Sequence, residues 1–217
     1  MTHSPEQPHQ PSPELQPHAI FDDFAWQEAS KPESLRINES GFTEDNEGNW
    51  YMVRKARNAV DLATALPHNL YNGPRDRYWN STEGRGLYFA NHPAAVEKLK
   101  LGVRSSQEPS ELYVCRIKPD AGEVLDVTTS IRHMDAGQKA AAILLRSRSI
   151  FPGIPSPNRR TYDRMYGDSR VVVTPPLAMS RLLTGNSAKI EAQKIKIRWA
   201  IVRQPEALQV VAHRAAR

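Results

Sequence analysis

Hydrophobic residues in this chain occur in short runs typical of β-strands, and the runs at 111–118 and 194–202 alternate with the two-residue period of a strand. The clearest run is KIKIRWAIV at 194–202, and the others are 50–57, 84–91, 111–118, 123–129 and 171–174. Residues 207–213 fit a final strand or a short helix. The pattern predicts a sheet at the centre of the fold. No run approaches the roughly 18 apolar residues of a membrane-spanning helix, so we expect no membrane partner.

Helical patterns lie between the strand patterns without alternating strictly with them. They cover 58–66, a segment that begins at Pro93, 134–150, and 175–185, which starts with prolines and ends at Gly185. Residues 68–76 and 151–170 are expected to be loops. The sum predicts an α+β fold with a mixed or mostly antiparallel sheet core and flanking helices. A parallel sheet is the weaker alternative, because it needs regular alternation of strands and helices.

Charge divides the chain near residue 50. Residues 1–50 hold ten acidic and two basic residues, a net charge of −8, whereas the remainder carries +13. Five prolines within residues 1–20 indicate disorder there. We therefore expect 1–49 to be a disordered, acidic, proline-rich tail with a short docking helix near 20–26, and 50–217 to be the folded domain. A basic domain attracts ligands that carry phosphate.

Several classes of protein are not expected from this sequence. The single cysteine, Cys115, excludes an intramolecular disulfide framework and a cysteine-rich zinc site, and its run LYVCRI predicts a buried strand. No His-x-x-x-His or carboxylate-rich spacing is present, so no metal site is expected. The first residues have no basic start followed by an apolar stretch. We expect a cytoplasmic protein, with export by a route without a signal left open.

Residues 75–91 are the densest group of chemistry-bearing side chains. Arginine binds phosphate through two parallel hydrogen bonds, aromatic rings stack on nicotinamide or a base, and glycine lets a backbone approach a ligand closely. The segment offers all three kinds of residue: Arg75, Arg77, Arg85, Tyr78, Trp79, Tyr88, Gly84 and Gly86. This combination suits a dinucleotide pocket. The alternative is an ordinary loop and strand whose aromatic residues fill the core.

The stretch MVRKARNAVDLATALPHNLYNGPRDRYWNSTEGRGLYFANHPAAVEKLK resembles the N-terminal half of RES-domain proteins. These are toxins of bacterial toxin–antitoxin pairs with an ADP-ribosyltransferase-like fold. The matching elements are RYWN at 77–80, LYFA at 87–90 and AAVE at 94–97. LYVCRIKPDAGEVLDVTT resembles the next strand pair of that family, and TPPLAMSRLLTG resembles a later helix. The resemblance spans residues 52–202.

This resemblance implies that NAD⁺ is the substrate and that the nicotinamide–ribose bond is broken. The transition state of such a cleavage is a ribose cation, which a carboxylate stabilises. The resemblance implies this role for Glu97. It implies pyrophosphate binding for Arg77, with Arg75 and Arg85 as the next candidates. It implies nicotinamide contact for Tyr88, with Tyr78 as a further binding residue. Either Ser187 or Ser169 would position the nicotinamide ribose or amide. The alternatives are a helix surface charge at Glu97 and a core ring at Tyr88.

Three functions stay open. The first is an NAD⁺-consuming toxin, a hydrolase or a phosphorylase-like enzyme, neutralised by a cognate antitoxin or immunity protein. The second transfers ADP-ribose to a macromolecule, and the absence of a Glu-x-Glu element favours hydrolysis over it. The third is a non-enzymatic, basic nucleic-acid-binding domain with an acidic tail. Nucleic acid is not the expected partner, because no binding motif is present.

Overall fold

The structure is a computed structural model that describes residues 22–56, 83–84, 86–97, 111–151, 153–175, 197–204 and 207–215. Its strands are β1 (Ala25–Trp26), β2 (Leu35–Ile37), β3 (Thr43–Asp45), β4 (Trp50–Ala56), β5 (Leu87–Ala90), β6 (Glu111–Ile117), β7 (Val124–Asp126), β8 (Val171–Thr174), β9 (Trp199–Val202) and β10 (Gln209–Ala215). Its helices are α2 (Pro93–Glu97), α3 (Ala136–Ile150) and α4 (Arg159–Tyr166), with short 3₁₀ turns η3 (Ala121–Glu123) and η4 (Ile131–His133).

All ten strands belong to one sheet. The strand order is β1-β10-β6-β4-β5-β9-β8-β7, and β3 joins β2 to β4. Among the described strands β7 and β8 form the only parallel pair, and every other pair is antiparallel. The prediction of an α+β fold with a mixed, mostly antiparallel sheet is therefore confirmed.

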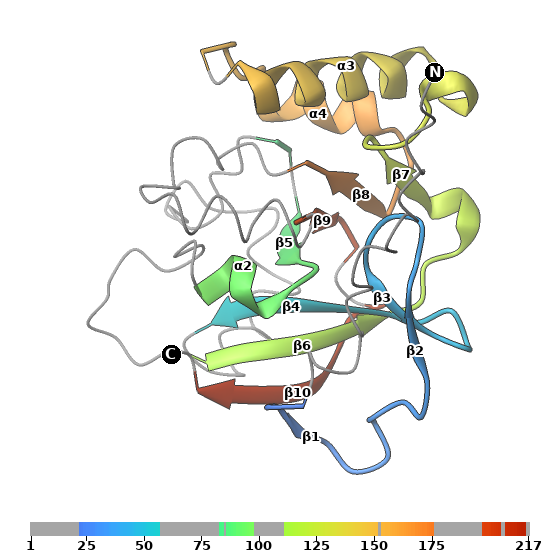
Figure 1. Cartoon of the computed structure of the whole chain (residues 1–217). Coiled ribbons are helices and arrows are strands. Elements are labelled where there is room, and N and C mark those ends of the chain that lie inside the picture. Colours follow the sequence, from blue (N-terminus) through green and yellow to red (C-terminus); the bar gives the residue numbers. More distant parts are fainter. Residues whose placement is uncertain are drawn as a thin grey trace, which may run out of the picture.

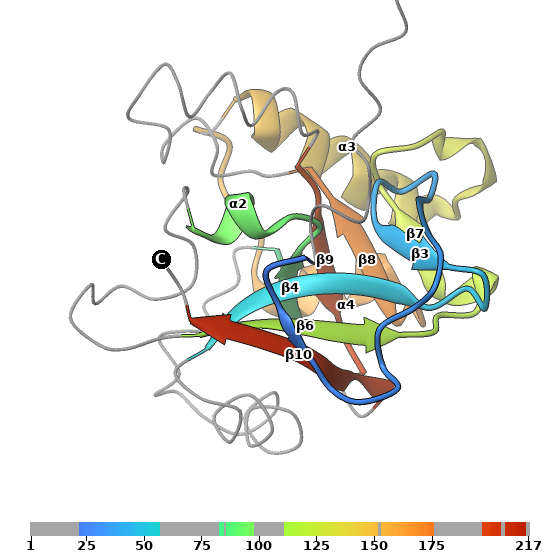
Figure 2. The ribbon, with the colours of Figure 1, turned by 60° about the horizontal axis from the view of Figure 1, so that its bottom comes forward.

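The sheet bends sharply between β4 and β5. Strand β4 pairs with β6 along its whole length, from Trp50 opposite Ile117 to Ala56 opposite Glu111. Between β4 and β5, by contrast, Val53 opposite Ala90 is the only pair in register within the described strands. Figure 2 shows β4, β6 and β10 running steeply across β8 and β9. The bend divides the sheet into a first half, which ends at β4, and a second half, which begins at β5.

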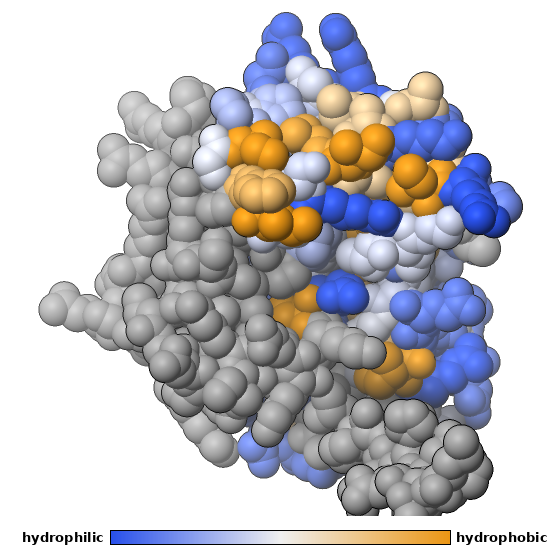
Figure 3. Space-filling model, turned by 45° about the horizontal axis from the view of Figure 1, so that its top comes forward, coloured by the Kyte–Doolittle hydropathy of each residue, from blue (hydrophilic) through white to orange (hydrophobic). Residues whose placement is uncertain are grey.

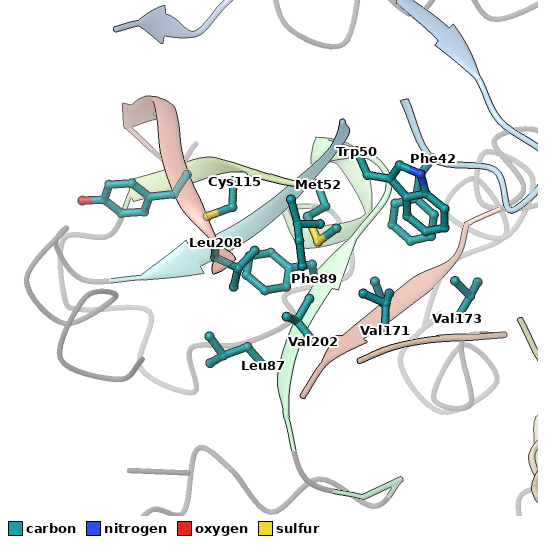
Figure 4. Packing of buried hydrophobic residues seen from close by; sticks show 13 residues of the cluster. Phe42, Trp50, Met52, Leu87, Phe89, Cys115, Val171, Val173, Val202 and Leu208 are labelled. Carbon is teal, nitrogen blue, oxygen red and sulfur yellow. The ribbon is translucent and has the colours of Figure 1, made fainter. Parts of the chain in front are cut away.

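The bend folds one face of the sheet onto itself and encloses a hydrophobic core, which we call the inner core. Alternation along β4 sends Trp50 and Met52 inward, while along β5 it sends Leu87 and Phe89 inward. Figure 4 shows these side chains packed against Val171, Val173 and Val202 of the second half. Cys115 on β6 also lies in the inner core, as its strand pattern predicted.

Helices cover the outer faces of both halves (Figure 1). Helix α2 packs Ala95 and Val96 against the first half, in a cluster that includes Tyr51 and Val53. Helices α3 and α4 cover the second half and bury Leu145, Tyr162 and Tyr166 among others against β8 and β9. The opposite side of α3 is exposed, and the apolar residues there are Ile143, Ile150 and, at its end, Phe151 (Figure 3). No helix in the described ranges is long and apolar enough to cross a membrane.

The prediction that residues up to 49 form a tail is wrong for 22–49. Strand β1 pairs with β10 at the edge of the sheet, and β2 and β3 extend it beside β4. Phe24 and Phe42 are buried, and the side chain of Asp45 accepts hydrogen bonds from Asn49 and from the hydroxyl of Tyr51. These three strands are very short, so their alternation is too brief to be recognised in the sequence.

The expected loop at 151–170 contains helix α4. The side chain of Asn158 caps the helix by accepting from the backbone N–H of Thr161, and Gly167, with φ of +56°, ends it. Tyr162 and Tyr166 are four residues apart and point into the core, while three of the other six positions of the helix are arginines. Because arginine and tyrosine are so frequent in this segment, its amphipathic helical pattern is difficult to recognise in the sequence. The expected helices at 58–66 and 175–185 and the expected loop at 68–76 lie essentially outside the described residues.

Candidate functional site

Strand β5 carries Tyr88 and lies where the two halves of the sheet meet. Leu87 and Phe89 enter the inner core, so Tyr88 projects from the opposite face. Its ring is half-buried and packs on the cluster beneath α3 and α4. Its hydroxyl donates a hydrogen bond of 3.1 Å to the carbonyl oxygen of Gly84. Tyr88 is therefore partly a packing residue, in agreement with the alternative that its ring belongs to the core. Its hydroxyl also binds the turn that precedes its own strand.

The two glycines before β5 serve close packing within the protein. Gly84 has φ of +108°, and a Cβ there would lie 2.7 Å from the ring of Tyr166. Gly86 has φ of +150°, and a Cβ there would lie 2.5 Å from Ile201. The sequence analysis expected these glycines to let a ligand approach the backbone. In the structure the residues that approach are side chains of α4 and β9.

Hydrogen bonds hold the turn at residues 83 and 84 from three sides. The hydroxyl of Tyr166, on α4, donates to the main-chain carbonyl of Glu83, and the hydroxyl of Tyr88 donates to that of Gly84. The hydroxyl of Thr174, at the end of β8, donates to Oε2 of the Glu83 carboxyl at 3.0 Å. We call the residues gathered here the Glu83 cluster: Glu83, Tyr88, Arg148, Tyr162, Tyr166 and Thr174.

The carboxyl group of Glu83 is the most unusual titratable group of this cluster. Only 6% of the residue is exposed, and burial raises its pKa to about 7, although the Thr174 hydrogen bond and the charge of Arg148 oppose the shift. Burial also raises the pKa of Tyr166, and the neighbouring Glu83 adds to the shift, so this phenol stays protonated. A carboxyl with a pKa near 7 can exchange a proton at neutral pH. Glu83 was not among the residues that the sequence pattern indicated.

The rest of the cluster is tied together by α3 and α4. Nη1 of Arg148, on α3, donates a hydrogen bond of 2.6 Å to the hydroxyl of Tyr162. The rings of Tyr162 and Tyr166 stack with their centroids 5.7 Å apart. Because Tyr166 binds the Glu83 carbonyl, these contacts connect both helices to the turn that leads into β5.

Arg54 is a second residue that the sequence analysis missed. It lies on β4 beside the bend, and its Nη1 donates a hydrogen bond of 2.8 Å to the main-chain carbonyl of Tyr88. Its guanidinium lies 5.9 Å from the centre of the Phe89 ring. Burial lowers its pKa to about 10, which leaves it charged at neutral pH. The alternation of β4 and the bend of the sheet together bring this arginine to β5.

Glu97 is the last residue of α2, the short helix that follows β5 directly. The side chain of His92 accepts a hydrogen bond of 3.1 Å from the backbone N–H of Ala94, and this contact stabilises the first turn of the helix. The expected start of a helix at Pro93 is confirmed. The side chain of Glu97 lies outside the described part of the chain. So do the other candidates from the 75–91 segment and one serine: Arg75, Arg77, Tyr78, Arg85 and Ser187.

Ser169 lies in a different place from Tyr88. It lines an open pocket of about 610 Å³ at the edge of the second half of the sheet, together with Asp163, Asp168, Arg170 and Arg203. Arg203 donates from Nη1 to the carbonyl of Ser169 at 2.9 Å, and its guanidinium lies 5.7 Å from the centre of the Tyr166 ring. Tyr166 thus contacts both regions, but neither Tyr88 nor Glu83 lines the pocket.

Within the described ranges no group of three or more histidine, cysteine, aspartate or glutamate side chains is arranged to hold a metal ion. Comparison with family models, with curated proteins and with solved structures finds no match to this chain.

Proposed function

We propose that this chain is an NAD⁺-consuming enzyme of the RES toxin type, with an ADP-ribosyltransferase-like fold, that cleaves the nicotinamide–ribose bond. The observation that carries the proposal is the junction of β4 and β5. A buried guanidinium, that of Arg54, is bonded there to the main chain of Tyr88, and the strand of Tyr88 leads directly into the helix that ends at Glu97. A cationic group and a phenol thus lie on opposite faces of one strand, β5, and the carboxyl-bearing segment follows that strand.

The chemistry assigns a role to each group. The bond between C1′ of the ribose and the nicotinamide nitrogen breaks, and its electron pair leaves with nicotinamide. A water molecule attacks C1′ and loses a proton, so the products are nicotinamide, ADP-ribose and one proton. The carboxylate of Glu97 stabilises the positive charge that develops on the ribose, as in glycoside hydrolysis. Tyr88 contacts the nicotinamide.

Arginine is the residue that best holds a pyrophosphate, because its guanidinium forms two parallel hydrogen bonds and keeps its charge. Arg77 is the arginine implied by the sequence, and Arg54 is the one that lies beside Tyr88. We assign pyrophosphate binding to Arg77; Arg54, whose guanidinium lies over Phe89 on the face of β5 opposite the Tyr88 ring, positions the strand through its bond to the Tyr88 carbonyl. The positive charge of the chain beyond residue 50, +13, favours the approach of the doubly negative pyrophosphate of NAD⁺.

The test is an NAD⁺ depletion assay on the purified full chain, with release of nicotinamide followed by chromatography. We expect wild type to release nicotinamide and Glu97→Gln to lose about 100-fold or more of the turnover, because the cation loses its stabilising charge. Arg77→Lys should raise KM more than it lowers kcat, because lysine cannot form the two parallel hydrogen bonds of arginine. The matched controls are Glu39→Gln and Arg132→Lys, both at exposed positions. Full turnover by Glu97→Gln contradicts the assignment, and wild type without turnover contradicts the function.

Labelled NAD⁺ separates hydrolysis from transfer. When the chain is incubated with adenine-labelled NAD⁺ and a cell lysate, hydrolysis leaves the label on free ADP-ribose. Transfer to a macromolecule makes the label precipitate with protein or nucleic acid. We expect free ADP-ribose, action in the cytoplasm, where NAD⁺ is abundant, and neutralisation by a cognate antitoxin.

A further inference from the structure

Glu83 carries a buried carboxyl that the proposed cleavage does not use. Burying a carboxyl is unfavourable unless its polar atoms are satisfied, so its presence calls for a reason. Its main-chain carbonyl accepts from Tyr166 of α4, and its Oε2 accepts from Thr174 of β8. These partners are 83 and 91 residues away in the sequence. One residue therefore joins a helix and a strand to the turn before β5.

This turn also determines where Tyr88 lies. The hydroxyl of Tyr88 donates to the carbonyl of Gly84, the residue that follows Glu83. Gly84 in turn packs so closely on Tyr166 and Tyr162 that there is no room for a Cβ. A shift of the 83–84 turn would therefore move the oxygen that holds the Tyr88 ring.

We infer that Glu83 is a positioning residue of the candidate site: its carboxyl ties the turn before β5 to Thr174 and so fixes the Tyr88 ring. The inference deepens the proposed function and rests on it only for the effect on turnover. The structural part, the tie between Glu83, Thr174 and Tyr88, can be tested without NAD⁺.

The groups around the carboxyl make the contact between Glu83 and Thr174 dependent on pH. Arg148 of α3 acts on the carboxyl through its positive charge, and Tyr166 of α4 lies next to Glu83. Tyr88 of β5 and Tyr162 of α4 are neighbours of Tyr166, and Arg203 lies on the Tyr166 ring. Because burial raises the pKa of Glu83 to about 7, the folded protein holds a proton that the unfolded chain releases near its ordinary pKa of 4.5. This contribution to stability is complete below pH 4.5 and is lost as the pH rises towards 7. The ionised form places a charge in the buried cluster, and the Thr174 hydrogen bond and the charge of Arg148 offset the cost of burying it only in part.

Three variants distinguish the effect of the Glu83–Thr174 hydrogen bond from the effect of the charge on the carboxyl. Glu83→Gln keeps an oxygen that accepts from Thr174 but cannot ionise, Thr174→Val removes the donor, and Glu83→Ala removes the tie. Urea unfolding of each full chain is followed between pH 5 and pH 8, together with the aromatic carbon NMR signals of Tyr88. Glu39→Gln is the control, since Glu39 is exposed.

We expect the urea midpoint of wild type to fall as the pH rises from 5 to 7, and that of Glu83→Gln to stay level over this range. The Tyr88 signals of wild type should shift with a midpoint near pH 7, and those of Glu83→Gln should not. Thr174→Val should move the Tyr88 signals at pH 6, while Thr174→Ser should restore them. If Glu83→Gln keeps the pH dependence of wild type, or if Thr174→Val leaves Tyr88 unchanged, the inference is wrong.

Turnover gives a separate readout. Thr174→Val should lower kcat about tenfold or more with little change in KM, because a displaced ring spoils alignment rather than affinity. The kcat of wild type should change with a midpoint near pH 7. Glu83→Gln should have the wild-type kcat at pH 6 and should not show this change. If wild type does not consume NAD⁺ but the Tyr88 signals respond as expected, the proposed function fails and the structural tie stands. If turnover is present and the Tyr88 signals do not respond, the tie fails alone.

Discussion

The inner core and most of the Glu83 cluster are buried, but they are built from different chemistry. In the inner core the side chains are almost all apolar, and burial raises the pKa of its single thiol, Cys115, to about 12. The Glu83 cluster buries a carboxyl, tyrosine hydroxyls and a guanidinium that bind one another or the main chain. The hydrophobic effect accounts for the first region. The second region needs a further reason, and positioning of Tyr88 is the one that the contacts support.

The largest effect in this comparison is expected for Phe89→Ala. The ring is completely buried in the inner core, so its loss should lower the free energy of unfolding by about 3–5 kcal/mol. Urea unfolding measures the loss, which should be the same at pH 6 and pH 8. The control is Phe151→Ala, because Phe151 is 63% exposed and should change stability by less than about 0.5 kcal/mol. Equal losses in the two variants would contradict the description of the inner core.

A smaller effect is expected for Gly84→Ala in the Glu83 cluster. An alanine there must adopt φ of +108° and place its Cβ 2.7 Å from the ring of Tyr166. We expect a loss of about 2–3 kcal/mol from backbone strain and crowding. Gly153→Ala is the control, since nothing lies within 4 Å of a Cβ at that position. If both glycine variants unfold at the same urea concentration, the close packing of the turn is refuted.

The smallest effect on stability is expected when one tyrosine hydroxyl is removed from each region. Tyr166→Phe leaves the buried carbonyl of Glu83 without this donor, so we expect a loss of about 1–2 kcal/mol. Tyr113→Phe, in the inner core, removes a hydrogen bond to Oε2 of Glu111, whose side chain is 42% exposed. Water can replace that partner, so the loss should stay below about 1 kcal/mol. If Tyr113→Phe lost more free energy of unfolding than Tyr166→Phe, the proposed difference between the two regions would be wrong.

The two regions also differ in how well they could be predicted. The inner core comes from segments whose alternation is plain in the sequence, such as ELYVCRI and WAIV, and these form β6 and β9. The Glu83 cluster joins the predicted segments β5 and α3 to a turn, to the end of β8 and to α4, a helix where a loop was expected. Of the predicted site residues, Tyr88 lies at this cluster and Ser169 lies in another pocket. Arg54 and Glu83 gave no local signal, because a single charged residue in a strand or turn is ordinary.

The sequence by itself determined the positions of most strands and of α3, because the period of the hydrophobic residues and the helix caps are local properties of the chain. Tertiary structure alone decided that residues 22–49 join the sheet, that the sheet bends between β4 and β5, and that Glu83 is buried. Each of these depends on contacts between distant segments, such as Thr174 with Glu83, which are 91 residues apart. The free energy of such a contact arises only when the whole fold has formed, so no short stretch of sequence encodes it.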